Sequence, residues 1–214
     1  MRRQSETEWT HEEIDDLLNE FRPITVPISI TIQGKQRILA FDEVEKMLLK
    51  AKLISLVDCM CRSKIKGCDA PLDVCITLDE EAEESISKKN ARQIEIDEAL
   101  RALKRGHEAG LVHIAYEIEG KKIGAICSCC SCCCHSLAAI TRLGYDRSVI
   151  EPAKMIASHN ADSCDNCGDC VSRCHFGAWE SIDGAVRHNP ENCAGCGICA
   201  SFCPSGAISL EQRN

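Results

Sequence analysis

Eight cysteines in the last quarter of the chain repeat a spacing that suits iron-sulfur chemistry. They form two Cys-x-x-Cys-x-x-Cys-x-x-x-Cys blocks, which begin at Cys164 and Cys193 with a period of 29 residues. Three thiolates of one tight loop can bind three irons of a cubane, whereas the fourth cysteine lies too far round the turn to complete that cluster. The fourth ligand is therefore expected from the other block. The sequence predicts two 4Fe-4S clusters, one held by Cys164, Cys167, Cys170 and Cys203 and one by Cys174, Cys193, Cys196 and Cys199.

The same segment resembles the bacterial dicluster ferredoxins of the clostridial type, because all eight cysteines are in register and Pro204 follows the last of them. The resemblance implies a ferredoxin-like fold and the transfer of low-potential single electrons between partner enzymes. His175 departs from the pattern, since the family usually has proline there. We expect a solvated loop histidine; a protonated one near sulfur would raise the potential of the cluster that Cys174 binds. Zinc is the alternative, but zinc sites usually pair two Cys-x-x-Cys knuckles.

Ten more cysteines lie in residues 1–157, in two groups. The first group is Cys59, Cys61, Cys68 and Cys75, and the second is Cys127, Cys129, Cys130, Cys132, Cys133 and Cys134. Side chains of adjacent residues cannot all face one point, so the second group must face at least two directions. We expect some of its thiols to lie opposite the first group, with Arg62 close by to balance thiolate charge.

These ten thiols could bind two all-cysteine cubanes with two thiols left over, or one cubane beside a set of redox-active thiols. Their pattern also resembles iron-sulfur proteins of anaerobes that place such segments before a ferredoxin module, which implies no particular reaction. We predict one or two further iron-sulfur clusters, with zinc or uncoordinated and disulfide-forming thiols as alternatives. His113 and His135 are expected to be ordinary interior or loop residues, with metal ligation as the alternative, and His107 is expected to be solvated.

Helices and strands must position these groups. Thr10 and Glu13 have the spacing of a capping box and open a helix over residues 10–21, which Pro23 ends. The pattern then predicts a strand at 24–32, a turn at 33–34, a return strand at 37–40, a helix of about ten residues from Asp42 and a strand at 54–57. Residues 79–93 are charged and lack an apolar stripe, which indicates an exposed helix or mobile connection without function.

The second cysteine group is expected to follow a hairpin. A helix at 98–109 precedes strands at 111–118 and 122–126, another helix covers 137–143, and short strands lie at 178–182 and 207–210. The predicted fold class is α+β: a cysteine-rich α+β domain in residues 1–157, followed by a ferredoxin-like dicluster module in residues 158–214.

Composition restricts the partners. Aromatic residues make up 4% of the chain and cysteine 18 of 214 residues, so the small aliphatic core needs help from bound metal. The net charge of −8 divides equally between the two predicted domains, and neither has the basic surplus of a nucleic-acid binder. The first residues carry no apolar secretory signal, which favours a cytoplasmic location, and no segment is long and apolar enough for a membrane span.

We therefore predict an electron-transfer protein or subunit that serves redox partner proteins, for instance within an oxidoreductase complex. The sequence has no nucleotide loop, Rossmann fingerprint or catalytic triad, which favours a carrier over an enzyme. The first alternative is a reductase whose cysteine-rich N-terminal site is catalytic. The second is a redox-sensing regulator, suggested by the helix at Glu98 and the following hairpin at Lys121-Lys122, but opposed by the overall acidity.

Overall fold

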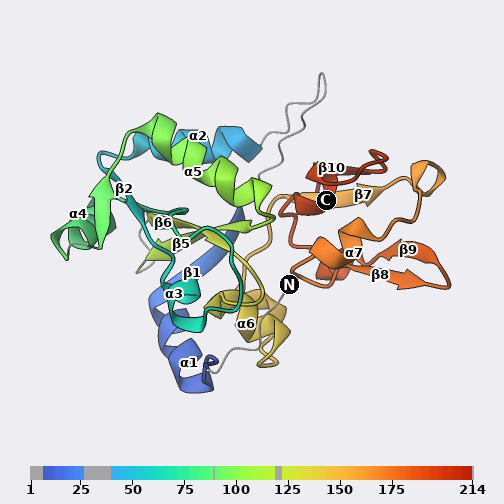
Figure 1. The fold of residues 1–214 in the computed structure, drawn as a ribbon, viewed down its shortest axis with the longest axis horizontal. Helices are drawn as coiled ribbons and strands as arrows, with labels where there is room; N and C mark the ends of the chain where they lie inside the picture. The colour runs from blue at the N-terminus through green and yellow to red at the C-terminus, as the bar shows by residue number, and fades with distance from the viewer. Residues whose placement is uncertain (1–6, 27–39, 89, 119–121, 214) are drawn as a thin grey trace.

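The computed structural model describes residues 7–26, 40–88, 90–118 and 122–213 (Figure 1). Helices and strands are mixed, in agreement with the predicted α+β class. A six-stranded antiparallel sheet of order β1-β5-β6-β3-β2-β4 organises the N-terminal part. Its strands are β1 (Phe21–Val26), β2 (Ile54–Val57), β3 (Cys75–Leu78), β4 (Ala91–Gln93), β5 (Val112–Ile118) and β6 (Lys122–Cys129), and its helices are α1 (His11–Glu20), α2 (Ala40–Lys50), α3 (Met60–Ile65), α4 (Asp79–Ser87), α5 (Ile96–Glu108) and α6 (His135–Thr141).

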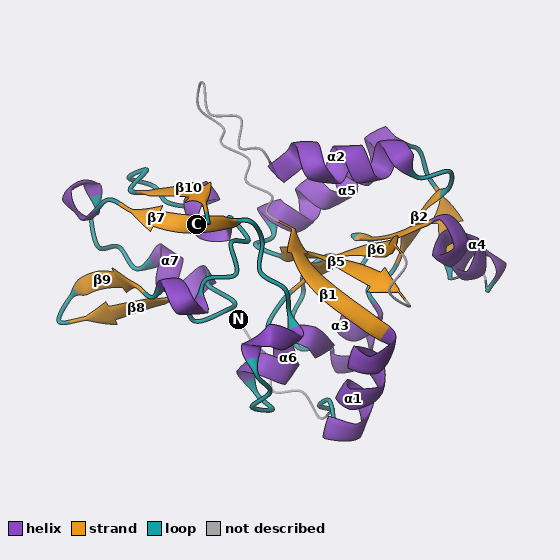
Figure 2. Cartoon of the chain, turned by 180° about the vertical axis from the view of Figure 1, so that it is seen from behind, coloured by secondary structure: helices purple, strands orange, loops and turns teal. Residues whose placement is uncertain are grey.

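The two faces of this sheet have different chemistry, because successive side chains of a strand point to opposite faces. One face carries Ile54, Leu56, Ile76 and Ile126, which pack in one core with residues of α2 and α5. The residues that alternate with them along the strands, among them Cys75, Cys127 and Cys129, face the other side. Figures 1 and 2 show α2 and α5 over the first face and α1, α3 and α6 on the second. The thiols therefore lie opposite the aliphatic core.

The first predicted helix is confirmed as α1. The Thr10 hydroxyl accepts a hydrogen bond from the Glu13 backbone N–H, and the Glu13 carboxylate accepts one from Thr10 N–H. The helix ends at Glu20, earlier than predicted, because the chain enters β1 at Phe21 and Pro23 already lies in this strand. The rest of the strand predicted at 24–32 and the turn at 33–34 lie outside the described residues. The return strand predicted at 37–40 lies there too except for residue 40, where the prediction was wrong, since α2 begins there.

The prediction for residues 79–93 was only partly right. A helix, α4, is present, but β4 follows it and pairs with β2 at the edge of the sheet. The three residues Ala-Arg-Gln of β4 show no apolar alternation, so the sequence carried no signal for this strand. The expectation that this segment carries no function stays a prediction, although α4 borders the cavity described below. The remaining predicted helices and strands are present, with ends displaced by a few residues.

The 29-residue sequence repeat is also a repeat of backbone structure. It comprises β7 (Met155–His159), α7 (Asp169–Arg173), β8 (Trp179–Ile182), β9 (Ala185–His188), α8 (Ile198–Ser201) and β10 (Ile208–Gln212), with single turns of 3-10 helix at Ala161–Ser163 and Pro190–Asn192. Strand β7 pairs with β10, and β8 pairs with β9. Gly168 and Gly197 begin α7 and α8 with positive φ angles of 78° and 82°. Equivalent residues of the two blocks therefore share one loop conformation.

The repeat packs directly against the N-terminal part. Phe176, Ala194 and Ile198 share a buried cluster with Ile114 of β5 and Leu137 of α6. His107 of α5 is buried and stacks on Phe202 at 5.7 Å between ring centroids, so the prediction of a solvated residue was wrong. The sequence places His107 on the charged side of α5, and it could not show that the repeat covers that side. The division of the chain at residue 157 stays a prediction.

Gly195 should be intolerant of any side chain. A Cβ at this position would lie 2.0 Å from the Met155 carbonyl oxygen, and its φ angle is +73°. We expect Gly195→Ala to lower the free energy of unfolding by about 3 kcal/mol or more, because backbone strain and overpacking add. Gly168→Ala is the matched control, since it has a similar φ angle of +78° but open space around its Cβ; it should cost about 1 kcal/mol. Equal costs in denaturant unfolding would contradict this account.

Candidate metal centres

The repeat brings seven of its eight cysteines together in two sets, whereas the eighth, Cys167, is exposed and interacts with Asp165 and Asp169. The pKa of Cys170 is raised to about 11 by burial, and the nearby thiols of Cys164 and Cys203 add to the shift. The pKa of Cys196 is raised to about 12, also mainly by burial, with Cys174 and Cys193 close enough to contribute. Cys199 has a raised pKa for the same reason and interacts with Cys196, Cys193 and Cys174. Each set combines thiols of both blocks. The assignment of particular thiols to particular clusters stays a prediction.

The surroundings of these thiols suit an iron-sulfur cluster. Cys174, Cys193, Cys196 and Cys199 border one small cavity that is otherwise lined by apolar residues and glycines. Backbone N–H groups point at sulfur: Ala178 N–H donates to Cys174 Sγ at 3.3 Å, and Ile198 N–H donates to Cys196. Such hydrogen bonds offset thiolate charge and adjust the potential of a bound cluster. Cys199 is buried and the other three thiols are partly exposed. The donor set is soft, and closely spaced thiols without a counter-charge need a metal to be stable as thiolates.

Six of the ten N-terminal thiols line a cavity with a volume of about 620 Å³. They are Cys59, Cys61, Cys75, Cys127, Cys129 and Cys134, and we call them the six-thiol group. Strand alternation delivers three of them, because Cys75 of β3 and Cys127 and Cys129 of β6 point to the same face of the sheet. The short helices α3 and α6 deliver the others, as Cys59 precedes α3, Cys61 lies in it and Cys134 precedes α6.

These six thiols influence one another strongly. The pKa of Cys59 is lowered to about 3, first by hydrogen bonds from Cys61 and Cys75 and further by the charge of Arg62. The pKa of Cys75 is raised by its interactions with Cys127 and Cys59 and by complete burial. Thiols that share protons in this way lose them together when a metal binds, because metal ligands are deprotonated. The group therefore has the donors for a cluster, and more thiols than a single cubane needs.

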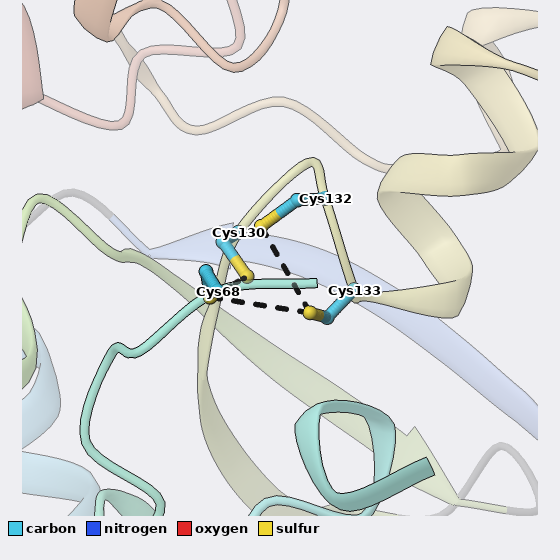
Figure 3. Close-up of side chains that lie close together, drawn as sticks. All are labelled: Cys68, Cys130, Cys132 and Cys133. Atoms are coloured by element: carbon cyan, nitrogen blue, oxygen red, sulfur yellow. Dashed lines mark hydrogen bonds between the residues drawn. The ribbon is translucent and has the colours of Figure 1, made fainter. Parts of the chain in front are cut away.

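The remaining four thiols form a tight group of their own at the turn that follows β6 (Figure 3). Cys68 lies in the loop after α3 and faces a turn that carries Cys130, Cys132 and Cys133; we call these residues the four-thiol group. All four Sγ atoms lie within 4.8 Å of one another. The predicted division of residues 127–134 between two directions is thereby confirmed, as is the expectation that some of these thiols lie opposite the loop of the first group.

Arg62 lies between the two groups and is 2% exposed. Its guanidinium donates to Cys130 Sγ at 3.6 Å, to the Ser128 carbonyl at 3.0 Å and to the Pro71 carbonyl at 3.2 Å. Burial opposes its charge, but the sulfur groups of Cys59, Cys130 and Cys75 raise its pKa above the usual value. Arg62 therefore balances thiolate charge in both groups, as the sequence suggested.

Three of the four histidines in residues 1–157 lie near the thiols or the repeat and have different roles. His113 is an interior residue, as expected, and its Nδ1 lies 3.1 Å from Ser128 Oγ. Burial lowers the pKa of His113 to about 3 and that of His107 to about 4, so both rings are neutral. His135 is also buried, but its Nδ1 lies 3.3 Å from Cys61 Sγ at the edge of the six-thiol group. His135 therefore forms a hydrogen-bond contact with Cys61, which is a candidate metal ligand.

Two aromatic residues at the thiols were missed from the sequence. Trp9 Nε1–H donates to the Cys133 carbonyl at 2.8 Å, and its ring meets His135 edge-on with centroids 5.8 Å apart. The Tyr116 hydroxyl lies 3.8 Å from Cys134 Sγ, and burial raises its pKa far above the usual value. Trp9 is one of only two tryptophans in a chain poor in aromatic residues, and that scarcity was the available signal.

His175 joins the repeat to the four-thiol group. Its Nδ1 accepts a hydrogen bond from Ser131 N–H at 3.2 Å, so its Nε2 carries the proton and donates to the Gly110 carbonyl at 2.8 Å. Ser131 lies in the turn between Cys130 and Cys132. The prediction of a solvated loop histidine was wrong, because both ring nitrogens bind residues distant in the sequence.

Comparison with known proteins adds one finding. Residues 186–209 match the family described as the 4Fe-4S binding domain. The matched segment contains Cys193, Cys196, Cys199 and Cys203. No curated protein matches the chain. The chain therefore contains a segment that binds a 4Fe-4S iron-sulfur cluster, and this family supports a role in electron transport. Across the described residues, none of the helices has the length and apolar character needed to cross a membrane.

Removal of Arg62 should destabilise the N-terminal part strongly. Arg62→Met leaves the Ser128 and Pro71 carbonyls without their donor and the Cys130 thiolate without a counter-charge. We expect the free energy of unfolding to fall by about 3–5 kcal/mol, the usual result of breaking a buried charge pair. Arg105→Met is the control, because Arg105 forms an exposed pair with Asp73 at 2.8 Å and should cost about 1 kcal/mol or less. An Arg62→Met protein as stable as the control variant in denaturant unfolding would refute the charge-balancing role.

Proposed function

We propose that this protein is an iron-sulfur electron carrier, or an electron-transfer subunit, that holds two 4Fe-4S clusters in a ferredoxin-like module of residues 158–214. The match of residues 186–209 to the 4Fe-4S binding domain carries this proposal. The equivalent loops of the first block extend it to a second cluster, because Gly168 and Gly197 give both blocks the same conformation before their short helices. When bound, such clusters supply reversible one-electron transfer.

In the proposed ligand sets, the fourth cysteine of each cluster comes from the other block, as the sequence predicted. Cys164, Cys167, Cys170 and Cys203 would hold one cluster, and Cys174, Cys193, Cys196 and Cys199 the other. The mutual influence of Cys170 with Cys164 and Cys203 supports the first set, and that of Cys196 with Cys174 and Cys193 supports the second. Backbone N–H groups that donate to sulfur would offset the negative charge of the reduced cluster. The apolar residues around Cys199 would limit the access of water to it.

The six-thiol group is proposed to hold a further iron-sulfur cluster. Its thiols come from two strands and two helix starts that meet at one cavity, which places six soft donors around the same space. Buried Arg62 would offset part of the added negative charge. This cluster would exchange electrons with the module, which packs against the same sheet through Phe176 and Ile198.

Redox partner proteins are proposed to dock through charge. The chain carries a net charge of −8, and its Lys and Arg residues are outnumbered in both predicted domains. An acidic surface accelerates association with a basic patch on a partner oxidoreductase and makes the rate sensitive to salt. A cytoplasmic location belongs to the same proposal.

The second candidate function is a reductase, and the size of the cavity favours it. A volume of about 620 Å³ exceeds what a metal site requires, and lies within the range of about 300–1,000 Å³ for small-molecule sites. Besides the thiols, the cavity is lined by Tyr116, His135 and the acidic residues of α4. Turnover of a small acceptor by the purified protein, lost in Cys129→Ser but with the module still reducible, would identify an enzyme and not a carrier.

The carrier proposal predicts the metal content of the anaerobically purified full chain. We expect at least about eight irons and eight acid-labile sulfides per chain from the module, and about four more of each if the six-thiol group holds a cubane. Cys196→Ser should remove about four irons and four sulfides, because Cys196 is a ligand of a single cluster. Ser172→Ala is the control, as its hydroxyl only donates to the Asp169 carbonyl, and it should keep the full content. Iron-poor, sulfide-free wild-type protein would refute the proposal.

A further inference from the structure

The spacing of the four-thiol group identifies a different kind of metal site from the clusters. Cys68 Sγ lies 3.7 Å from Cys130 Sγ and 4.0 Å from Cys133 Sγ, and Cys133 Sγ lies 3.9 Å from Cys132 Sγ. Four thiolates at the corners of a tetrahedron around one ion, with metal–sulfur bonds of about 2.3 Å, are about 3.8 Å apart. In a cubane each thiolate binds a different iron, which places the sulfur atoms considerably farther apart.

We propose that Cys68, Cys130, Cys132 and Cys133 bind a single tetrahedral metal ion of the thiophilic class, Zn²⁺ or iron. Soft thiolate donors in tetrahedral geometry select these ions. The proposal replaces a cluster with a mononuclear site for these four residues, and it does not depend on the proposed carrier function.

The site is held in shape by residues that are not ligands. The turn is closed by hydrogen bonds from Cys133 N–H and Cys134 N–H to the Cys130 carbonyl. Three side chains bind its backbone from outside: Trp9 at the Cys133 carbonyl, Arg142 at the Ser131 carbonyl and His175 at Ser131 N–H. A turn fixed in this way presents its thiols in advance of the ion, which reduces the entropy cost of binding.

The opposing loop is built for close approach. Gly67 is buried, and a Cβ on it would lie 3.0 Å from the Cys132 carbonyl oxygen and 3.2 Å from Cys133 Sγ. A residue without a side chain is therefore needed next to Cys68 for this thiol to reach the turn. Lys66, with a φ angle of 52°, ends α3 and directs the loop towards the turn.

Charge and burial are also consistent with one divalent ion. Cys130 and Cys133 are buried, whereas Cys68 and Cys132 are partly exposed, which leaves a path for the ion. Four thiolates and one divalent ion carry a net charge of −2. Arg62, whose Nη1 lies 3.6 Å from Cys130 Sγ, offsets part of this charge.

The test compares metal and acid-labile sulfide per chain in the anaerobically purified full protein and in Cys68→Ser and Cys132→Ser. Each variant should lose about one metal ion and no sulfide, because a mononuclear site contains no inorganic sulfide. Ser131→Ala is the matched control in the same turn and should keep the ion. Loss of about four irons together with four sulfides would overturn the proposal in favour of a cluster, and unchanged metal content would overturn it in favour of free or disulfide-bonded thiols.

Spectroscopy of the wild-type protein decides the question if the cysteine variants fail to fold. X-ray absorption at the zinc edge should give four sulfur ligands at about 2.3 Å. If zinc is absent, the EPR spectrum of oxidised protein should contain a high-spin ferric signal that is separate from the cluster signals. Absence of both would overturn the proposal. A chain that keeps the single ion but contains no cluster iron would contradict only the carrier function.

Discussion

Adjacent residues of an extended chain point in opposite directions, and this constraint decides where the thiols of residues 127–134 lie. Cys127 and Cys129 follow the alternation of β6 to the cavity face of the sheet, together with Cys75 of β3. The turn that follows places Cys130, Cys132 and Cys133 beside Cys68. One cysteine-rich run thus contributes to two groups of thiols, and among the described residues the aliphatic core on the opposite face of the sheet contains none.

Concentrated thiolate charge has to be offset, and the fold does this with few groups. Arg62 is buried between the two N-terminal groups, and it contacts one sulfur of each: its guanidinium donates to Cys130 Sγ and its backbone N–H donates to Cys59 Sγ at 3.5 Å. Its charge acts on three thiols. In the repeat, backbone N–H groups take over this role. His175 connects these regions, since it follows Cys174 in the sequence and binds Ser131 between Cys130 and Cys132. A short chain of covalent and hydrogen bonds thus leads from the repeat to the four-thiol group.

Local signals allowed much of the fold to be predicted. The capping box at Thr10, the helical periodicity of α5 and the hairpin of β5 and β6 follow from adjacent residues, and all were found. The features that the sequence did not predict depend on contacts between residues far apart in the chain. The burial of His107 and the partners of His175 arise only when the repeat packs on the sheet. Strand β4 exists because β2 offers an edge. The spacing of the cysteines indicated the candidate ligands, but the division of the ten N-terminal thiols into six and four required the strand register and the loop of Gly67.

If the cysteines of the repeat serve reversible one-electron transfer, a redox titration of the anaerobic full chain followed by EPR will detect it. The account predicts that stepwise reduction at low potential produces the spin-one-half signals of reduced 4Fe-4S clusters, and that reoxidation restores the starting spectrum. A protein that accepts no electrons over this range, or whose signals do not return after one cycle, would contradict the account.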